Sequence, residues 1–145
     1  MEIYKAYKFR LYPTEEQKVL INKTLGCKRF VYNYYLNYLK GNKNKKLFSL
    51  YNDLTNLKKE NSFLKEVDSC ALRCAIFDLK DSFDDYYAKK TGYPKFKNKF
   101  SKQSYRTNCT RSIYKENEYN TIELDLLTRN IKLPKLGRVK IRGFR

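Results

Sequence analysis

The period of the hydrophobic pattern changes twice along this chain, from two residues to about 3.6 and back to two. Residues 3–12 alternate, so that Tyr7, Phe9 and Leu11 share one face of an extended segment. Alternation returns over residues 121–142, and helical spacing fills the region between. A strand followed by several helices and then further strands is typical of an α+β protein. Because a single strand is not stable alone, we expect the first strand to pair with one beyond residue 103.

Four helices are predicted between the two strand patterns. A capping box from Thr14 to Gln17 predicts that the first helix begins at residue 15, and Gly26 is expected to end it. Further helices are predicted over residues 27–40, 49–60 and 68–89, and Asp68 is the expected N-cap of the last. The side chains expected to face inward are Phe30, Val31, Tyr34, Tyr35, Tyr38, Leu39, Leu50, Leu54, Leu57, Leu72, Ala75, Ile76, Leu79, Phe83 and Tyr86.

The helix–glycine–helix pattern over residues 14–40 has two interpretations. It is compatible with a helix-turn-helix, whose second helix enters a major groove. The exposed surface of that second helix would offer Lys28, Arg29, Asn33 and Asn37. Its broad apolar faces favour instead an ordinary hairpin of two helices.

Charge points to a polyanionic partner. The 145 residues contain 32 Lys and Arg against 15 Asp and Glu, for a formal net charge of +17. Residues 92–112 hold six basic residues and no acid, and residues 128–145 hold seven and no acid. The first stretch interleaves cations with aromatics, which suits phosphates and unpaired bases respectively, although a solvated loop with buried aromatics is the alternative. Its candidate contacts are Tyr93, Lys95, Phe96, Lys97, Lys99, Lys102, Tyr105, Arg106 and Arg111; the second stretch adds Lys135, Arg138 and Lys140.

Metal and membrane sites are not predicted. The cysteines have no zinc-site spacing, histidine is absent, and free buried thiols in a reducing cytosol are expected at Cys27, Cys70, Cys74 and Cys109. No apolar run is long enough to span a bilayer, and the N-terminus is not a signal peptide, so we expect a cytoplasmic, nucleoid-associated protein. A two-metal site needs carboxylates from separate elements, so a solvated helix face is expected for Asp78, Asp81, Asp84 and Asp85.

Six segments, taken in order, resemble one family. They are K-A-Y-K-F-R-L-Y-P-T-E-E-Q (5–17), L-G-C-K-R-F-V-Y-N-Y-Y-L (25–36), L-K-E-V-D-S-C-A-L (64–72), G-Y-P-K-F-K (92–97), S-Y-R-T (104–107) and I-K-L-P-K-L-G-R-V-K-I-R (131–142). These segments resemble the N-terminal part of TnpB (OrfB) proteins of insertion-sequence transposons. The resemblance implies an RNA-guided DNA endonuclease in which a helical recognition lobe interrupts a wedge-like β-barrel. Residues 1–13 and 92–145 would then form a partial barrel, and residues 14–91 a four-helix lobe.

The resemblance also implies particular contacts. Tyr51, Ser69, Arg73 and Thr110 occupy positions that read a short DNA motif beside the target. Position 73 is often glutamine in the family, so Arg73 suggests a changed motif, because Arg pairs with guanine whereas Gln pairs with adenine. The segments at residues 92–97 and 104–107, Ser104 included, would hold the guide RNA or the heteroduplex backbone.

Catalysis is not expected from these residues. The family's cleavage resides in a later RuvC-like domain with three acidic metal ligands and a zinc ribbon, and no counterpart is found in this sequence. We therefore expect a truncated, nucleic-acid-binding N-terminal fragment without a cofactor, not an enzyme. Two alternatives are a helix-turn-helix regulator of transposition, and a remnant that binds its element's RNA and modulates a full-length copy.

Overall fold

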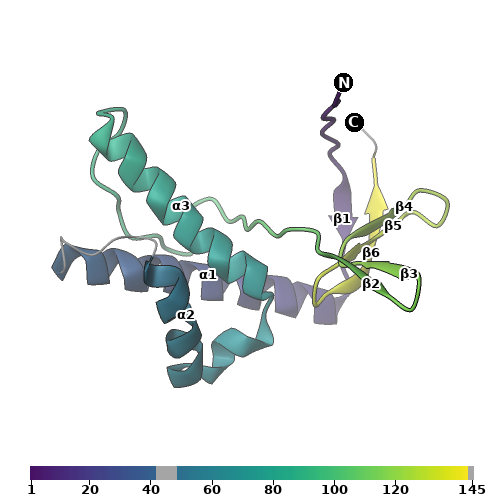
Figure 1. Cartoon of the computed structure of the whole chain (residues 1–145), viewed down its shortest axis with the longest axis horizontal. Coiled ribbons are helices and arrows are strands. Elements are labelled where there is room, and N and C mark those ends of the chain that lie inside the picture. Colours follow the sequence, from purple (N-terminus) through teal and green to yellow (C-terminus); the bar gives the residue numbers. More distant parts are fainter. Residues whose placement is uncertain (42–48, 144–145) are drawn as a thin grey trace. The chain divides into compact units, whose positions relative to one another are not determined.

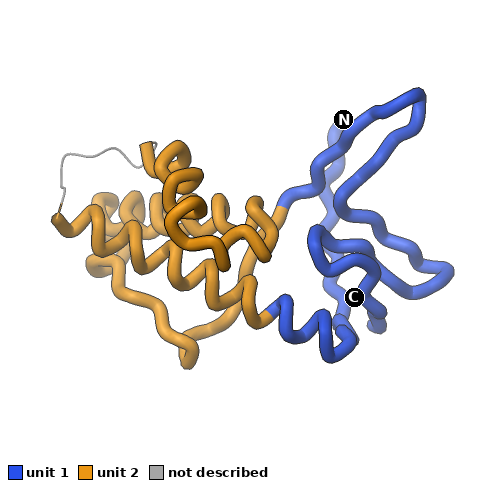
Figure 2. The backbone as a smooth tube through the Cα atoms, turned by 90° about the horizontal axis from the view of Figure 1, so that it is seen from below, with its two compact units in different colours: residues 1–21, 108–145 blue, residues 22–107 orange. Residues whose placement is uncertain are grey.

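The computed structural model describes residues 1–41 and 49–143 and divides the chain into two compact units. One unit contains residues 1–21 and 108–145, and the other contains residues 22–107 (Figure 2). Helices and antiparallel sheets occur together, which confirms the α+β class. The described strands form no closed barrel. The segment G-N-K-N-K-K (41–46), whose composition predicts a basic, polar loop, lies outside the described residues apart from Gly41.

The first unit contains a four-stranded antiparallel sheet in the order β1-β6-β5-β4 (Figure 1). The strands are β1 (Arg10–Tyr12), β4 (Glu123–Asp125), β5 (Asn130–Leu133) and β6 (Gly137–Arg142). The first strand therefore pairs with a late strand, as expected, with Leu11 opposite Ile141. It is shorter than the predicted residues 3–12, because β6 supplies partners for three of its residues and an extended segment without a partner lacks ladder hydrogen bonds.

The two faces of this sheet differ in chemistry. Val139 and Ile141 are buried on one face, at 0% and 2% exposure. The alternating residues of β6 point the other way and are exposed. The register places cations on that second face from three neighbouring strands, namely Arg10, Lys132, Arg138, Lys140 and Arg142.

A second, two-stranded sheet was not predicted. It is a hairpin of β2 (Arg111–Tyr114) and β3 (Asn117–Asn120). Its two-residue turn places Lys115 and Glu116 at positive φ, 46° and 64°. Asn-Gly or Asp-Gly is the usual signal for such a turn, so Lys-Glu gave no indication of it.

The second unit is helical. It contains most of α1 (Glu15–Gly41), then α2 (Ser49–Glu60), the 3₁₀ helix η1 (Ser62–Glu66) and α3 (Ser69–Tyr87). The bounds of α2 are those predicted, and Asp68 caps α3 by accepting a hydrogen bond from the Cys70 amide at 3.1 Å. Of the side chains predicted to face inward, Val31, Tyr35, Leu39, Leu50, Leu54, Leu57, Leu72, Ala75, Ile76, Leu79 and Phe83 are buried, Phe30 and Tyr38 are half-buried, and Tyr34 and Tyr86 are exposed.

The predicted capping box is present at the start of α1. The Thr14 amide donates to the Gln17 side chain at 2.9 Å, and the Gln17 amide donates to the Thr14 hydroxyl at 3.3 Å. The remaining Gln17 N–H groups donate to the carbonyls of Leu136 and Arg138, at 3.2 and 2.8 Å. Within the first unit, this one side chain therefore both caps the helix and ties it to β6 and the turn before it.

The predicted break at Gly26 is wrong, because α1 is one helix of 27 residues. A glycine inside a helix costs only about 1 kcal/mol relative to alanine. Buried residues on both sides of Gly26, among them Thr24 and Val31, give the helix more than that in packing. The described residues therefore contain three α-helices where four were predicted, and residues 15–41 are one continuous helix in place of the favoured hairpin of two helices.

We predict that Gly26→Ala stabilises the protein. A Cβ atom at this position would meet only the end of the Arg29 side chain, at 3.8 Å. The free energy of unfolding should rise by about 0.5–1 kcal/mol, because alanine loses less backbone entropy on folding than glycine does. Chemical denaturation followed by circular dichroism measures it. A loss of stability would instead indicate a turn at Gly26.

Candidate nucleic-acid interface

The basic stretch of residues 92–107, here named the strap, runs along α1 in the helical unit. It contains no helix or strand. Asn33 of α1 exchanges two hydrogen bonds with the Lys97 backbone, both of 2.8 Å, in the manner of a strand pair. Arg29, one turn earlier, donates to the Gln103 side chain at 2.7 Å. One face of α1 thus positions a segment that has no regular structure of its own.

A charge cluster holds the end of the strap. The Asp78 carboxylate lies 2.7 Å from the Lys28 ammonium and 2.5 Å from the Arg106 guanidinium. Lys28 also donates to the Ser104 carbonyl at 2.9 Å, and Thr107 donates to the Asp68 carboxylate. The facing carboxylate raises the pKa of Arg106. The cluster therefore joins α1, α3 and the strap.

Two predictions about this cluster are wrong. Lys28 was expected on an exposed helix face, but its side chain is 9% exposed. Asp78 was expected to be solvated, but it is 23% exposed and holds two cations. The reason is tertiary, since the strap covers the face of α1 that would otherwise be open to solvent. Of the other acids in the predicted group, Asp84 pairs with Lys80 on the surface of α3.

A tight loop lies in the middle of the strap. The Asn98 side chain accepts hydrogen bonds from the amides of Phe100 and Ser101, at 2.9 and 3.0 Å. The Gln103 side chain donates to the carbonyls of Asn98, Lys99 and Ser101. These bonds use the polar groups of the loop internally, so its lysine side chains are left to project outward.

A small cationic notch lies between this loop and α1. Its volume is about 30 Å³, roughly the space of one water molecule or one phosphate oxygen. No described residue that lines it is acidic. The cations around it are Lys28, Arg29, Lys97 and Lys102. Such an arrangement favours a single anionic oxygen of a backbone phosphate.

The aromatic residues of the strap divide into two groups. Tyr93 packs edge-on against Phe83 and Tyr86, with ring centroids 5.6 and 5.2 Å away, and burial raises the pKa of Tyr105. Tyr93 therefore packs on α3 although it is 41% exposed, and Tyr105 is half-buried. Phe96 and Phe100 are more open, at 50% and 86% exposure. Phe96 lies under the Lys40 ammonium, at 4.2 Å, and Phe100 lies 5.2 Å from the Lys99 ammonium. Its larger exposure makes Phe100 the most available to a base of the four predicted rings.

Comparison with known proteins finds one matching family model and two similar proteins. Residues 1–45 match the OrfB family model described as "Helix-turn-helix domain". A Streptomyces pristinaespiralis protein named "Putative RNA-guided DNA endonuclease" is 32% identical over 120 residues, covering 78% of this chain and 30% of that protein. The Escherichia coli (strain K12) protein "Putative RNA-guided DNA endonuclease InsQ" is 28% identical over 152 positions, covering 100% of this chain and 35% of that protein.

The chain is related to the TnpB/OrfB proteins. This confirms the resemblance seen in the sequence. The chain spans about a third of the length of the two relatives. The helix-turn-helix family match falls on a region that, in this chain, contains the whole of α1, which is unbroken.

Three positions that the TnpB/OrfB resemblance assigns to DNA lie on the surface of α2 and α3. Ser69 and Arg73 are exposed and one turn apart on α3. Tyr51 of α2 packs on Phe77, the next residue along the same face of α3, with ring centroids 5.0 Å apart. Burial and the positive charge of Arg73 lower the pKa of Lys58. The cations near these three positions are therefore Arg73 and Lys58.

The other predicted contacts lie in the first unit. Thr110, Lys135 and Lys140 are exposed. Arg111 is paired with Glu118, with Nε 2.8 Å from the carboxylate, and Arg138 donates to Asn130 and Glu123. The two arginines are thus partly neutralised, whereas the lysines are available to phosphates.

Asn33, Arg29 and Gln103 are the residues that position the strap, and sequence reasoning did not assign them that role. Their polar side chains carry no signal of a partner 64 to 74 residues away.

Among the described residues no group of three or more His, Cys, Asp or Glu could hold a metal ion, and no described helix is long and apolar enough to cross a membrane. The thiols are free; Cys27 and Cys74 are buried, whereas Cys109 is exposed, contrary to expectation.

Proposed function

We propose that this chain binds the guide RNA of a TnpB/OrfB-type system and the DNA motif beside its target, and that it does so without cutting. The observation that carries the proposal is the strap, a lysine-rich segment fixed against α1 and α3. Lys95, Lys97, Lys99 and Lys102 stand on it as exposed cations. Cations held on a fixed backbone lose little entropy when they meet the regularly spaced phosphates of a strand.

The α2–α3 surface supports the DNA part of the proposal. Arg73 is exposed and stands one turn from Ser69, so its guanidinium can approach the edge of a base pair. An arginine favours guanine through two parallel hydrogen bonds. The motif read by this chain would then contain a guanine where glutamine-bearing relatives take adenine.

A regulator of transposition that binds duplex DNA is the second candidate. The match of residues 1–45 to a helix-turn-helix family favours it. A helix-turn-helix needs a turn that sets its second helix into the major groove, and α1 continues through that position. We therefore favour the RNA-binding function.

An electrophoretic shift assay at graded salt tests the proposal. The probes are structured RNA from the end of the chain's own insertion sequence, duplex DNA and single-stranded DNA. We expect the structured RNA to bind best, with an affinity that falls steeply as salt rises. Binding to duplex DNA alone would support the regulator, and cleavage of any probe with Mg²⁺ would overturn the claim that this chain does not cut.

A further inference from the structure

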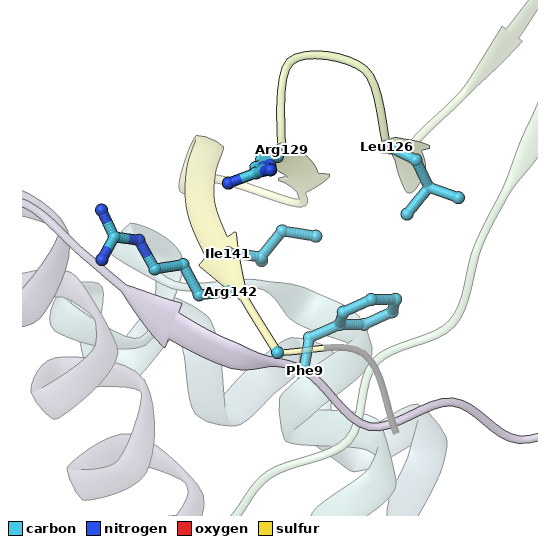
Figure 3. A pocket seen from close by; sticks show the side chains of 6 residues that line it. Phe9, Leu126, Arg129, Ile141 and Arg142 are labelled. Atoms are coloured by element: carbon cyan, nitrogen blue, oxygen red, sulfur yellow. The ribbon is translucent and has the colours of Figure 1, made fainter.

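Two adjoining hollows lie where the β1–β6 pair ends, past the partners Arg10 and Arg142. The first has a volume of about 440 Å³ and is lined by Phe9, Leu126, Arg129, Ile141, Arg142 and Gly143 (Figure 3). The second has a volume of about 450 Å³ and is lined by Lys8, Phe9, Arg10, Tyr12, Arg142 and Gly143. They share three residues, so one ligand can extend from the first into the second.

The side chains that line the two hollows come from the two different faces of the sheet. Ile141 belongs to the buried face, and in Figure 3 the side chains of Phe9 and Leu126 gather around it. Arg142, the next residue, extends in the other direction. The first hollow, here called the apolar hollow for its Phe9, Leu126 and Ile141 side chains, also has Arg129 in its wall. The second, here called the cationic hollow, lies on the face with Arg10 and is lined by Tyr12 as well.

The turn between β4 and β5 fixes the wall of the apolar hollow. The Asp125 carboxylate accepts hydrogen bonds from the amides of Leu127 and Thr128, at 3.0 and 3.1 Å. Arg129 adopts a φ of 54°, and its carbonyl accepts the Ile141 amide at 3.0 Å. Leu126, which is 60% exposed, is thus presented by a backbone that the turn holds in place.

The cationic hollow is similarly built. The guanidinium carbons of Arg10 and Arg142 each lie 5.6 Å from the centroid of the Tyr12 ring. The ring holds both charges at the end of the sheet. Among the described residues, none that lines either hollow is acidic, and no carboxylate pairs with Arg129 or Arg142.

We propose that this end of the sheet captures one unpaired nucleotide of a nucleic-acid strand. Its base would enter the apolar hollow against Phe9, Leu126 and Ile141. Its flanking phosphates would lie against Arg10 and Arg142 on the cationic face. A volume of about 440 Å³ falls within the roughly 300–1,000 Å³ of pockets that hold small ligands. Apolar walls with cations beside them suit a nucleotide, since a base has an apolar face and its phosphate is anionic.

The inference rests on the proposed nucleic-acid-binding function but concerns different residues from the strap. A base inside a continuous duplex is stacked on its neighbours and cannot enter. The full chain should therefore bind a duplex with a single-nucleotide bulge about tenfold more tightly than the same duplex without it. A 2-aminopurine at the bulge reports its capture by fluorescence, and the RNA and DNA versions of the probe distinguish the source of the nucleotide.

Phe9→Leu tests the site, because it keeps apolar contact with Ile141 and removes the flat ring. We expect the tenfold preference to disappear, while affinity for the paired duplex stays within about twofold of the original. Arg142→Gln should weaken binding of the bulged probe several-fold. It should also reduce the slope of log affinity against log salt concentration by about one, the amount expected for one lost phosphate contact. Tyr114→Leu and Lys115→Gln, exposed changes elsewhere in the same unit, are the matched controls.

The possible results separate the two proposals. If Phe9→Leu loses the preference for the bulged probe while its circular dichroism melt is unchanged, the result supports nucleotide capture. The captured nucleotide is then assigned to RNA or DNA according to which version of the probe showed the preference. Equal binding of bulged and paired probes by the original chain overturns capture and leaves the strap proposal standing. A preference that survives in Phe9→Leu also overturns capture at this site. Failure to bind either probe refutes the nucleic-acid function on which both depend.

Discussion

Asp78→Asn is expected to lower the free energy of unfolding by about 3 kcal/mol, since breaking a buried ion pair costs roughly 3–5 kcal/mol. The change leaves the Lys28 ammonium, which is 9% exposed, without its carboxylate. Arg106 is 58% exposed, so losing its pairing adds little. Denaturation followed by far-UV circular dichroism, which reports the helices, measures the effect. A shift of the melting temperature of roughly 10 °C is expected for a chain of this size.

Asp81→Asn is the matched control, because it removes the same charge from an exposed position of α3. Its effect should lie within about 0.5 kcal/mol of zero. Lys28→Met should cost less than Asp78→Asn, because Asp78 keeps Arg106 and the methionine fills the space of the lysine stem. If the Asp78→Asn and Asp81→Asn variants have the same melting temperature, the cluster does not stabilise the helical unit.

Local signals along the sequence predicted individual elements well. The leucines of α2 recur at helical spacing, and Ser49 to Glu60 were predicted as the helix that the structure shows. The capping box at Thr14 and the cap at Asp68 both form their predicted hydrogen bonds. In each case the partners are near neighbours in the chain, so composition and spacing alone determine the outcome.

Features that depend on tertiary contacts were missed. The burial of Lys28 follows from its contact with Ser104 of the strap, 76 residues further along, and the unbroken helix at Gly26 follows from packing on both sides of it. The candidate site divides in the same way. Sequence showed the acid-free, lysine-rich strap, whereas the hollow at Phe9 brings together residues from three separate segments, and no local pattern indicated that they would meet.

Replacing Lys95, Lys97 and Lys99 together with Gln is expected to weaken RNA binding about a hundredfold at physiological salt. Each lost phosphate contact removes roughly 0.7–0.9 from the slope of log affinity against log salt concentration. Three lost contacts therefore lower the slope by slightly more than two. Because 0.15 M salt lies almost one decade below the 1 M reference, the affinity at 0.15 M falls by about two decades. Titration of labelled RNA at several salt concentrations gives both the affinity and the slope.

A matched triple change separates local contact from total charge. Lys23, Lys59 and Lys65 are exposed lysines of the same unit that lie off the strap. Replacing them with Gln removes the same three charges, so any attraction that depends only on net charge falls equally in both variants. A slope that drops by about two for the strap variant and by less than one for the control locates the phosphates on the strap. Equal losses would mean that the strap is only one part of a diffuse positive surface. Since the Asn33 bonds involve the Lys97 backbone, they survive the substitution, and the difference reports the side-chain charges rather than the fold.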